Sequence, residues 1–167
     1  MYPKGHMGVS LLLYAPIGFF LSVTGQIPFA ILGFLMVGAF ATIPDKDMNA
    51  PLLSHRGRSH SIASALLFGV VLAFIAVFLA PLMLTLGLPA VPIIVFVFFI
   101  GAFTVMTHLA GDALTPTGVR MFWPISNRRI SLGFFLASST IANWVLWLFG
   151  WFMILMTFLL VMGTLFG

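Results

Sequence analysis

The sequence predicts an all-α, polytopic membrane protein of about five transmembrane helices, because of its composition, its apolar runs and its one-sided basic residues. Of its 167 residues, 62% are hydrophobic and only 6% are charged. Soluble domains are nearer to half apolar and a quarter charged. A bilayer core of roughly 30 Å takes about 20 apolar residues per helix, so the chain has room for about five or six spans. We therefore expect a single integral membrane domain over residues 1–167.

Glycine, proline and charged residues divide the apolar sequence into segments of membrane-spanning length. The expected spans cover about residues 7–24, 28–43, 61–86, 91–113 and 132–166. The last stretch is short for two spans and a turn, and Gly150 has no polar turn residues beside it. We therefore expect one long, tilted helix there.

The basic residues predict the orientation of these spans. They lie before the first span, between the second and third, or between the fourth and fifth: Lys4, Lys46, Arg56, Arg58, Arg120, Arg128 and Arg129. The positive-inside rule makes that side cytoplasmic, so the N-terminus is inside and the C-terminus outside an inner or plasma membrane. Topology and contacts with lipid headgroups explain the net charge of +4, and we expect no nucleic-acid partner.

The histidine and acidic side chains all fall at that same membrane face. They are His6, His55, His60, His108, Asp45, Asp47 and Asp112. Taken singly, a histidine or acid near a helix end is most simply an interfacial or solvated side chain. His108 and Asp112 are harder to explain in this way, because they share one helix face inside an apolar segment, where ionisable groups are costly and usually functional. Taken together, the seven residues favour one site.

The residue types indicate a metal site built from nitrogen and oxygen ligands. The chain has no cysteine, so thiolate ligands are excluded. Imidazole with carboxylate suits a divalent transition metal, with Zn²⁺ preferred over Mn²⁺, Fe²⁺ or Ni²⁺. Seven candidates exceed what one tetrahedral ion needs, so either two ions bind, or one ion binds and the other groups serve as bases or outer ligands.

The first-choice metal ligands are His6, Asp45, His60, His108 and Asp112. Asp47 and His55 are the candidates for a catalytic base or an outer ligand. Arginine is well suited to phosphate, so Arg56, Arg58 and Arg120 are candidates for substrate binding.

Several short motifs recur in the same order in a known family. They are Pro-Asp-Lys-Asp at 44–47, His-Arg-Gly-Arg-Ser-His-Ser at 55–61, and His-Leu-Ala-Gly-Asp at 108–112 with Thr115 and Gly118. With an N-terminal histidine before the first span, the chain resembles the YdjM-like membrane-bound metal-dependent hydrolases over essentially its whole length. Members often carry Thr where this chain has Ser59, a change that keeps the hydroxyl. The resemblance implies metal-dependent hydrolysis.

The function expected from these observations is metal-dependent hydrolysis of a membrane lipid or another amphiphile that is reached from the cytoplasmic leaflet. A structural metal clamp on a membrane scaffold or regulator is the main alternative. A metal transporter is disfavoured, because an ion path requires polar groups along the membrane depth, and the outer half of each expected span is almost purely apolar. Asn143 is the one polar candidate deep in the last expected span.

The one-sided basic residues make the topology testable with reporter fusions. Fusions at Gly25 and Gly87 are expected to report outside, and fusions at Ala50 and Ser126 inside, because only the latter pair lies in connections rich in Lys and Arg. An inside signal at Gly87 would contradict the span assignment and separate the expected metal ligands.

Overall fold

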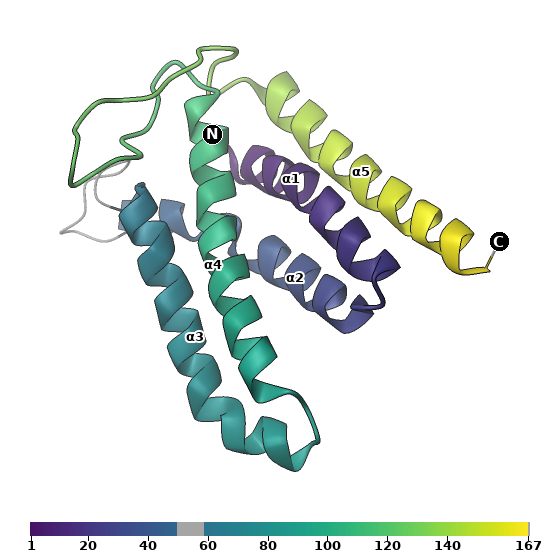
Figure 1. Cartoon of the computed structure of the whole chain (residues 1–167). Helices are drawn as coiled ribbons and strands as arrows, with labels where there is room; N and C mark the ends of the chain where they lie inside the picture. The colour runs from purple at the N-terminus through teal and green to yellow at the C-terminus, as the bar shows by residue number, and fades with distance from the viewer. Residues whose placement is uncertain (50–58, 167) are drawn as a thin grey trace.

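The computed structural model describes residues 1–49 and 59–166 of the chain (Figure 1). Within these residues there are five long α-helices, one short 3-10 helix and no strand: α1 (Pro3–Val23), α2 (Ile27–Phe40), η1 (Pro44–Asn49), α3 (Ile62–Thr85), α4 (Ala90–Ala113) and α5 (Thr140–Phe166). Five helices are long and apolar enough to cross a membrane. The predicted all-α, multi-span architecture is confirmed.

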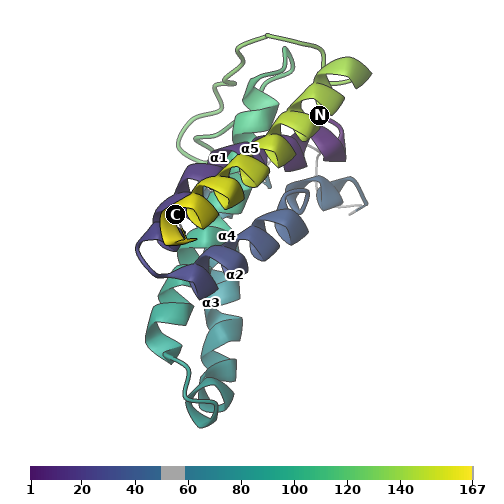
Figure 2. The same ribbon diagram turned by 90° about the vertical axis from the view of Figure 1, so that its right-hand side faces the viewer.

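The helices form two groups that share α4. Helices α1, α2 and α5 run side by side with α1 between the other two, and α3 pairs with α4 in a hairpin (Figures 1 and 2). Helix α4 also contacts α1 and α2. The N-terminus, η1 and the connection 114–139 lie together at one end of the molecule (Figure 1). The turns that follow α1 and α3 lie away from that end, so the long helices alternate in direction as the sequence predicts (Figure 1).

A small apolar core joins the two groups of helices. It comprises Leu11, Tyr14, Met36, Val37 and Ile100, all less than 9% exposed and contributed by α1, α2 and α4. Large apolar side chains on the outer surface of α3, in contrast, are mostly exposed. This distribution suits a bilayer, where the hydrocarbon around the protein is as apolar as its interior.

Glycines allow α1 and α5 to pack with their backbones in contact. A Cβ atom on Gly150 would lie 2.5 Å from the carbonyl oxygen of Gly8 and 2.9 Å from its Cα. Small residues at such positions let transmembrane helices approach closely and gain packing energy. The second turn of α1 is thereby held against the middle of α5.

The last span differs from the expected range. Helix α5 runs unbroken through Gly150, but it begins at Thr140 and not at residue 132. The backbone N–H groups of Leu132 and Phe134 donate to the carbonyls of Ala113 and Leu114, at 2.7 and 2.9 Å. These bonds tie the apolar residues of 131–139 to the end of α4 and prevent helix formation there. The prediction that Asn143 lies deep in the span is wrong for the same reason, because Asn143 lies in the first turn of α5.

The contact between α1 and α5 predicts a stability difference between two glycines of the same helix. Gly150→Ala is expected to destabilise the protein by about 1–3 kcal/mol, since the added methyl group meets backbone atoms that cannot move independently. Gly163→Ala is the matched control, because a Cβ there would meet nothing within 4 Å. Thermal unfolding of both variants in the same detergent measures the effect. Equal stability of the two variants would contradict the close approach.

Candidate metal centre

Five ionisable side chains from four parts of the chain meet at the end of the helices where the termini of α1, α3 and α4 gather. His6 lies in the first turn of α1, Asp45 in η1 and His60 just before α3, whereas His108 and Asp112 lie one turn apart on α4. His6, His60, His108 and Asp112 are 0% exposed, and the side chain of Asp45 is 18% exposed. The interior of the protein therefore encloses a group of polar atoms that lipid cannot solvate.

Each of the three imidazoles directs Nε2 toward both carboxylates. His60 Nε2 and His108 Nε2 each lie 3.4 Å from Asp45 Oδ1 and 3.6 and 3.8 Å from Asp112 Oδ2. His6 Nε2 lies 3.6 Å from Asp45 Oδ2 and 3.6 Å from Asp112 Oδ1. These separations exceed the roughly 2.7–3.2 Å of ordinary N–H···O hydrogen bonds.

The hydrogen bond of His108 fixes the direction of its lone pair. Its Nδ1 lies 2.8 Å from the carbonyl oxygen of Ala41, and because a carbonyl can only accept, Nδ1 carries the proton. In the neutral ring, Nε2 then presents a lone pair to two carboxylates that can also only accept. A cation between these atoms removes that repulsion, and a carbonyl bonded to the opposite ring nitrogen is the usual support of a metal-binding histidine.

His6 supplies an independent indication of a cation-binding site. Among the described residues neither of its ring nitrogens has a hydrogen-bond partner, although the side chain is fully buried. Buried polar atoms in proteins are nearly always satisfied. The ring stacks on that of His108, with centroids 3.6 Å apart. Gly111 makes room for it, because a Cβ there would lie 3.1 Å from His6 Nδ1.

The spacing of the ligand atoms fits a transition metal. Two atoms about 2.1 Å from one ion lie roughly 3.4 Å apart when the angle between them is tetrahedral. The distances of 3.4–3.8 Å between the histidine nitrogens and the carboxylate oxygens are close to this value. The five side chains can thus bind a divalent metal ion, and their nitrogen and oxygen donors suit Zn²⁺ and its neighbours.

Asn143 anchors the segment that carries His6. Its Oδ1 accepts a hydrogen bond of 2.9 Å from the backbone N–H of Tyr2, one of the donors that the first turn of α1 leaves without a helical partner. Its Nδ2 donates to the carbonyl of Ser139 at 2.8 Å. Asn143 is 1% exposed, so it is a fully bonded clamp between α5 and α1.

Ser61 holds the segment that carries His60 in place, through hydrogen bonds at the start of α3. Its hydroxyl accepts from the backbone N–H of Ser64 at 3.2 Å, and the Ser64 hydroxyl accepts from the N–H of Ser61 at 3.1 Å. This reciprocal capping box fixes the start of α3. Ser59 Oγ also lies 3.0 Å from His60 Nδ1, so both neighbours of His60 restrain the ring. The α-amino group of Met1 completes the surroundings, 3.4 Å from Asp112 Oδ1.

The structure brings together all five predicted metal ligands, whereas most of the other candidate site residues lie outside its described part. His55, Arg56 and Arg58, and the side chain of Asp47, fall outside the described residues, so their roles stay predictions. Arg120 is half-buried in the connection between α4 and α5.

Sequence reasoning missed three contributors to the site. The role of the Ala41 carbonyl could not be predicted from the sequence, because every residue has a backbone carbonyl. Gly111 resembled any small residue in a span. Asn143 was noticed as a lone amide, but its role depends on where α5 begins.

The chain belongs to the family described as YdjM inner membrane protein, whose sequence model matches residues 1–166. Together with the five apolar helices, this membership identifies a multi-pass protein of the inner membrane. The family description says nothing of hydrolysis or of metal. No curated protein and no solved structure matched the chain.

The metal site predicts a loss of bound metal on changing one carboxylate. Asp112→Asn keeps the volume of the side chain but weakens its donor oxygen, and it is expected to lose most of the metal that the wild-type protein carries. Elemental analysis after purification in metal-supplemented buffer measures this.

Thr104→Val is the matched control for that loss. Thr104 is equally buried one turn before His108, and within the described part of the chain its hydroxyl donates to the Ile100 carbonyl alone. The control should retain its metal. Equal metal content in wild type and Asp112→Asn, or none in either, would contradict the site.

Proposed function

We propose that this protein is a metal-dependent hydrolase embedded in the inner membrane, acting on a phosphate-containing lipid or similar amphiphile at the cytoplasmic face. The observation that carries the proposal is the buried histidine and aspartate cluster at the end of the helices, next to an arginine-bearing connection. A divalent ion held there would act as a Lewis acid toward a phosphoryl or ester oxygen and make water a better nucleophile.

Arg120 is our candidate for binding the phosphate of such a substrate. The residue after it, Met121, accepts a hydrogen bond of 2.8 Å from the N–H of Ile62, two residues beyond His60. The residue before it, Val119, is buried in one cluster with Ala113, which follows Asp112. Arg120 Nε is buried and has no hydrogen-bond partner within the described part of the chain. A substrate phosphate would supply one, since guanidinium groups match phosphate oxygens.

The remainder of the connection has the character of a membrane-interface segment. Ile125 is 94% and Phe134 is 71% exposed, and Arg128 and Arg129 are exposed as well. The two arginines line a pocket of about 510 Å³ together with Ser126 and Ser131. No acidic residue follows Asp112 in the sequence. This combination favours contact with the acyl boundary and the anionic headgroups of the cytoplasmic leaflet.

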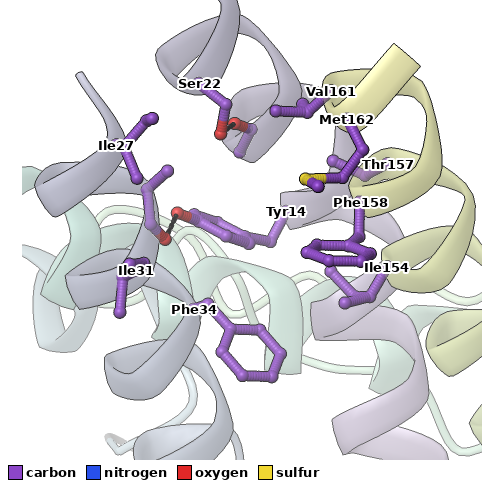
Figure 3. Close-up of a pocket in the computed structure, with 12 residues that line it drawn as sticks. Tyr14, Ser22, Ile27, Ile31, Phe34, Ile154, Thr157, Phe158, Val161 and Met162 are labelled. Atoms are coloured by element: carbon purple, nitrogen blue, oxygen red, sulfur yellow. Dashed lines mark hydrogen bonds between the residues drawn. The ribbon is translucent and has the colours of Figure 1, made fainter. Parts of the chain in front are cut away.

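The pocket beside the C-terminal half of α1 argues against the transport alternative. A pocket of about 340 Å³ opens between α1, α2 and α5 (Figure 3). Its hydroxyl groups, those of Tyr14, Ser22 and Thr157, each donate to a backbone carbonyl, and its other lining residues are nearly all apolar. Such a surface suits hydrocarbon, whereas an ion path needs polar groups aimed into it.

A metal clamp in a scaffold or regulator is the alternative that shares the same cluster. The two functions differ in whether substrate reaches the ion. Asp45 is the only one of the five ligands whose side chain is partly exposed, at 18%, so access would be from its side. Asp47 and His55, the predicted proton acceptors, follow Asp45 in the sequence and stay candidates for that role.

Hydrolysis is tested by release of phosphate or a phosphorylated headgroup from phospholipids in mixed micelles with added Zn²⁺ or Mn²⁺. Chelator should abolish the activity. His60→Ala and His108→Ala should each lower turnover by more than the roughly 10–100-fold that loss of an outer-shell partner costs, with unchanged yield of folded protein.

Ser22→Ala is the matched control for this activity, since Ser22 lies at the other end of α1 and should leave turnover unchanged. A panel of lipid phosphates and esters that stays intact with metal-loaded protein would favour the clamp in place of the hydrolase.

A further inference from the structure

The ring planes of the three histidines limit how they can share an ion. An imidazole donates in the plane of its ring. The rings of His6 and His108 are parallel to within 7°, with centroids 3.6 Å apart, so their planes do not meet within bonding distance, about 2.1 Å, of both Nε2 atoms. The rings of His60 and His108 are inclined by 63° with centroids 5.2 Å apart, and their planes can converge on one point. The ligand atoms of His6, His108 and Asp112 lie close enough together to share one ion. The parallel ring planes of His6 and His108, however, argue against a shared ion.

The carboxylate oxygens of Asp45 and Asp112 also form two sets, one near His6 and the other near His60 and His108. Asp45 presents Oδ2 to His6, at 3.6 Å, and Oδ1 to His60 and His108, at 3.4 Å. Asp112 presents Oδ1 to His6, at 3.6 Å, and Oδ2 to His60 and His108, at 3.6 and 3.8 Å. Each carboxylate therefore offers one oxygen to His6 and the other to the remaining pair of histidines.

From this division we infer that the cluster is a two-ion centre in which Asp45 and Asp112 each bridge both ions. One set of ligands is His60, His108, Asp45 Oδ1 and Asp112 Oδ2. The other set is His6, Asp45 Oδ2 and Asp112 Oδ1. The inference rests on the metal-binding part of the proposed function, and it adds the number of ions and the assignment of each ligand atom.

The two sets differ in how complete they are. The first has two nitrogens and two oxygens, the number that a tetrahedral ion requires. The second has three protein atoms, which leaves coordination free for substrate or water. In two-metal hydrolases, paired ions clamp a phosphoryl group between them, and an open coordination position lets the substrate bind. The five ligands therefore favour phosphate chemistry over a single structural ion.

The experiment loads purified, metal-stripped protein with Mn²⁺ in detergent and measures both the ion count per chain and the electron paramagnetic resonance spectrum. Two ions per chain with an exchange-coupled spectrum are expected, because ions bridged by carboxylates interact magnetically. The spectrum is needed beside the count, because an adventitious second ion on the surface would leave two uncoupled signals.

Ligand variants then separate the two positions. His6→Ala should retain about one ion and lose the coupling, since only the three-ligand set is damaged. Asp45→Asn should weaken binding at both positions, because its carboxylate serves both. Ser10→Ala is the matched control: Ser10 is buried one turn beyond His6 and bonds Thr107, which keeps its own bond to the Thr104 carbonyl. It should retain two coupled ions.

The outcomes distinguish this inference from the function that it extends. One ion per wild-type chain, lost equally in His6→Ala and His60→Ala, would overturn the two-ion centre and leave the metal site standing. Two uncoupled ions would also overturn it. No bound ion at saturating Mn²⁺ and at saturating Zn²⁺ would overturn the inference and the proposed metal-dependent function together.

Discussion

Two carboxylates and three imidazoles enclosed within a membrane protein form the interaction on which the rest of this structure depends. Burying a charge without a partner is costly, and lipid offers no compensation. Here Nδ1 of His108 donates its proton to the Ala41 carbonyl. In the neutral ring, Nε2 therefore carries a lone pair that faces the oxygens of Asp45 and Asp112, which can also only accept. A divalent cation turns these mutually repelling acceptors into a ligand set. The arrangement of these side chains therefore suits a metal ion.

The surrounding scaffold serves to hold ligands from distant parts of the chain at that point. Helix α4 carries two ligands and contacts α1, α2 and α3. Helix α1 is placed against α5 by the glycine contact at Gly8 and Gly150 and by the bond from Tyr2 to Asn143. The capping box at Ser61 fixes the residue next to His60. Helix packing in a bilayer depends on such close contacts and buried hydrogen bonds, since burial of apolar surface gives little driving force there.

The membrane explains why the chemistry is confined to one end. Apolar side chains cover the outer faces of the spans, and the hydroxyls around Tyr14 are bonded to backbone carbonyls. The connection 114–139, which carries arginines and exposed apolar residues, lies at the same end of the molecule as the N-terminus and η1 (Figure 1). A headgroup could therefore meet the cluster while its acyl chains stay in hydrocarbon. This is the physical basis for preferring an amphiphilic substrate to a transported ion.

The sequence by itself determined the fold class, the number of spans and the five candidate metal ligands that the structure brings together. Those features depend on composition, on segment length and on the rarity of ionisable residues, all of which are properties of the chain before it folds. His108 and Asp112 could be paired from their spacing alone, because a helix brings residues four apart onto one face. The rarity of histidine and acid in this chain made the other ligands recognisable.

Only the tertiary structure decided how those ligands are divided and what holds them. The start of α5 depends on hydrogen bonds between Leu132, Phe134 and the end of α4, which no local pattern encodes. That start gives Asn143 its role as a clamp. The parallel rings of His6 and His108, and the two directions in which each carboxylate points, follow from the packing of α1 against α4. Relative orientation of side chains from separate helices is set by packing in three dimensions, so the grouping of the candidate ligands emerges only there.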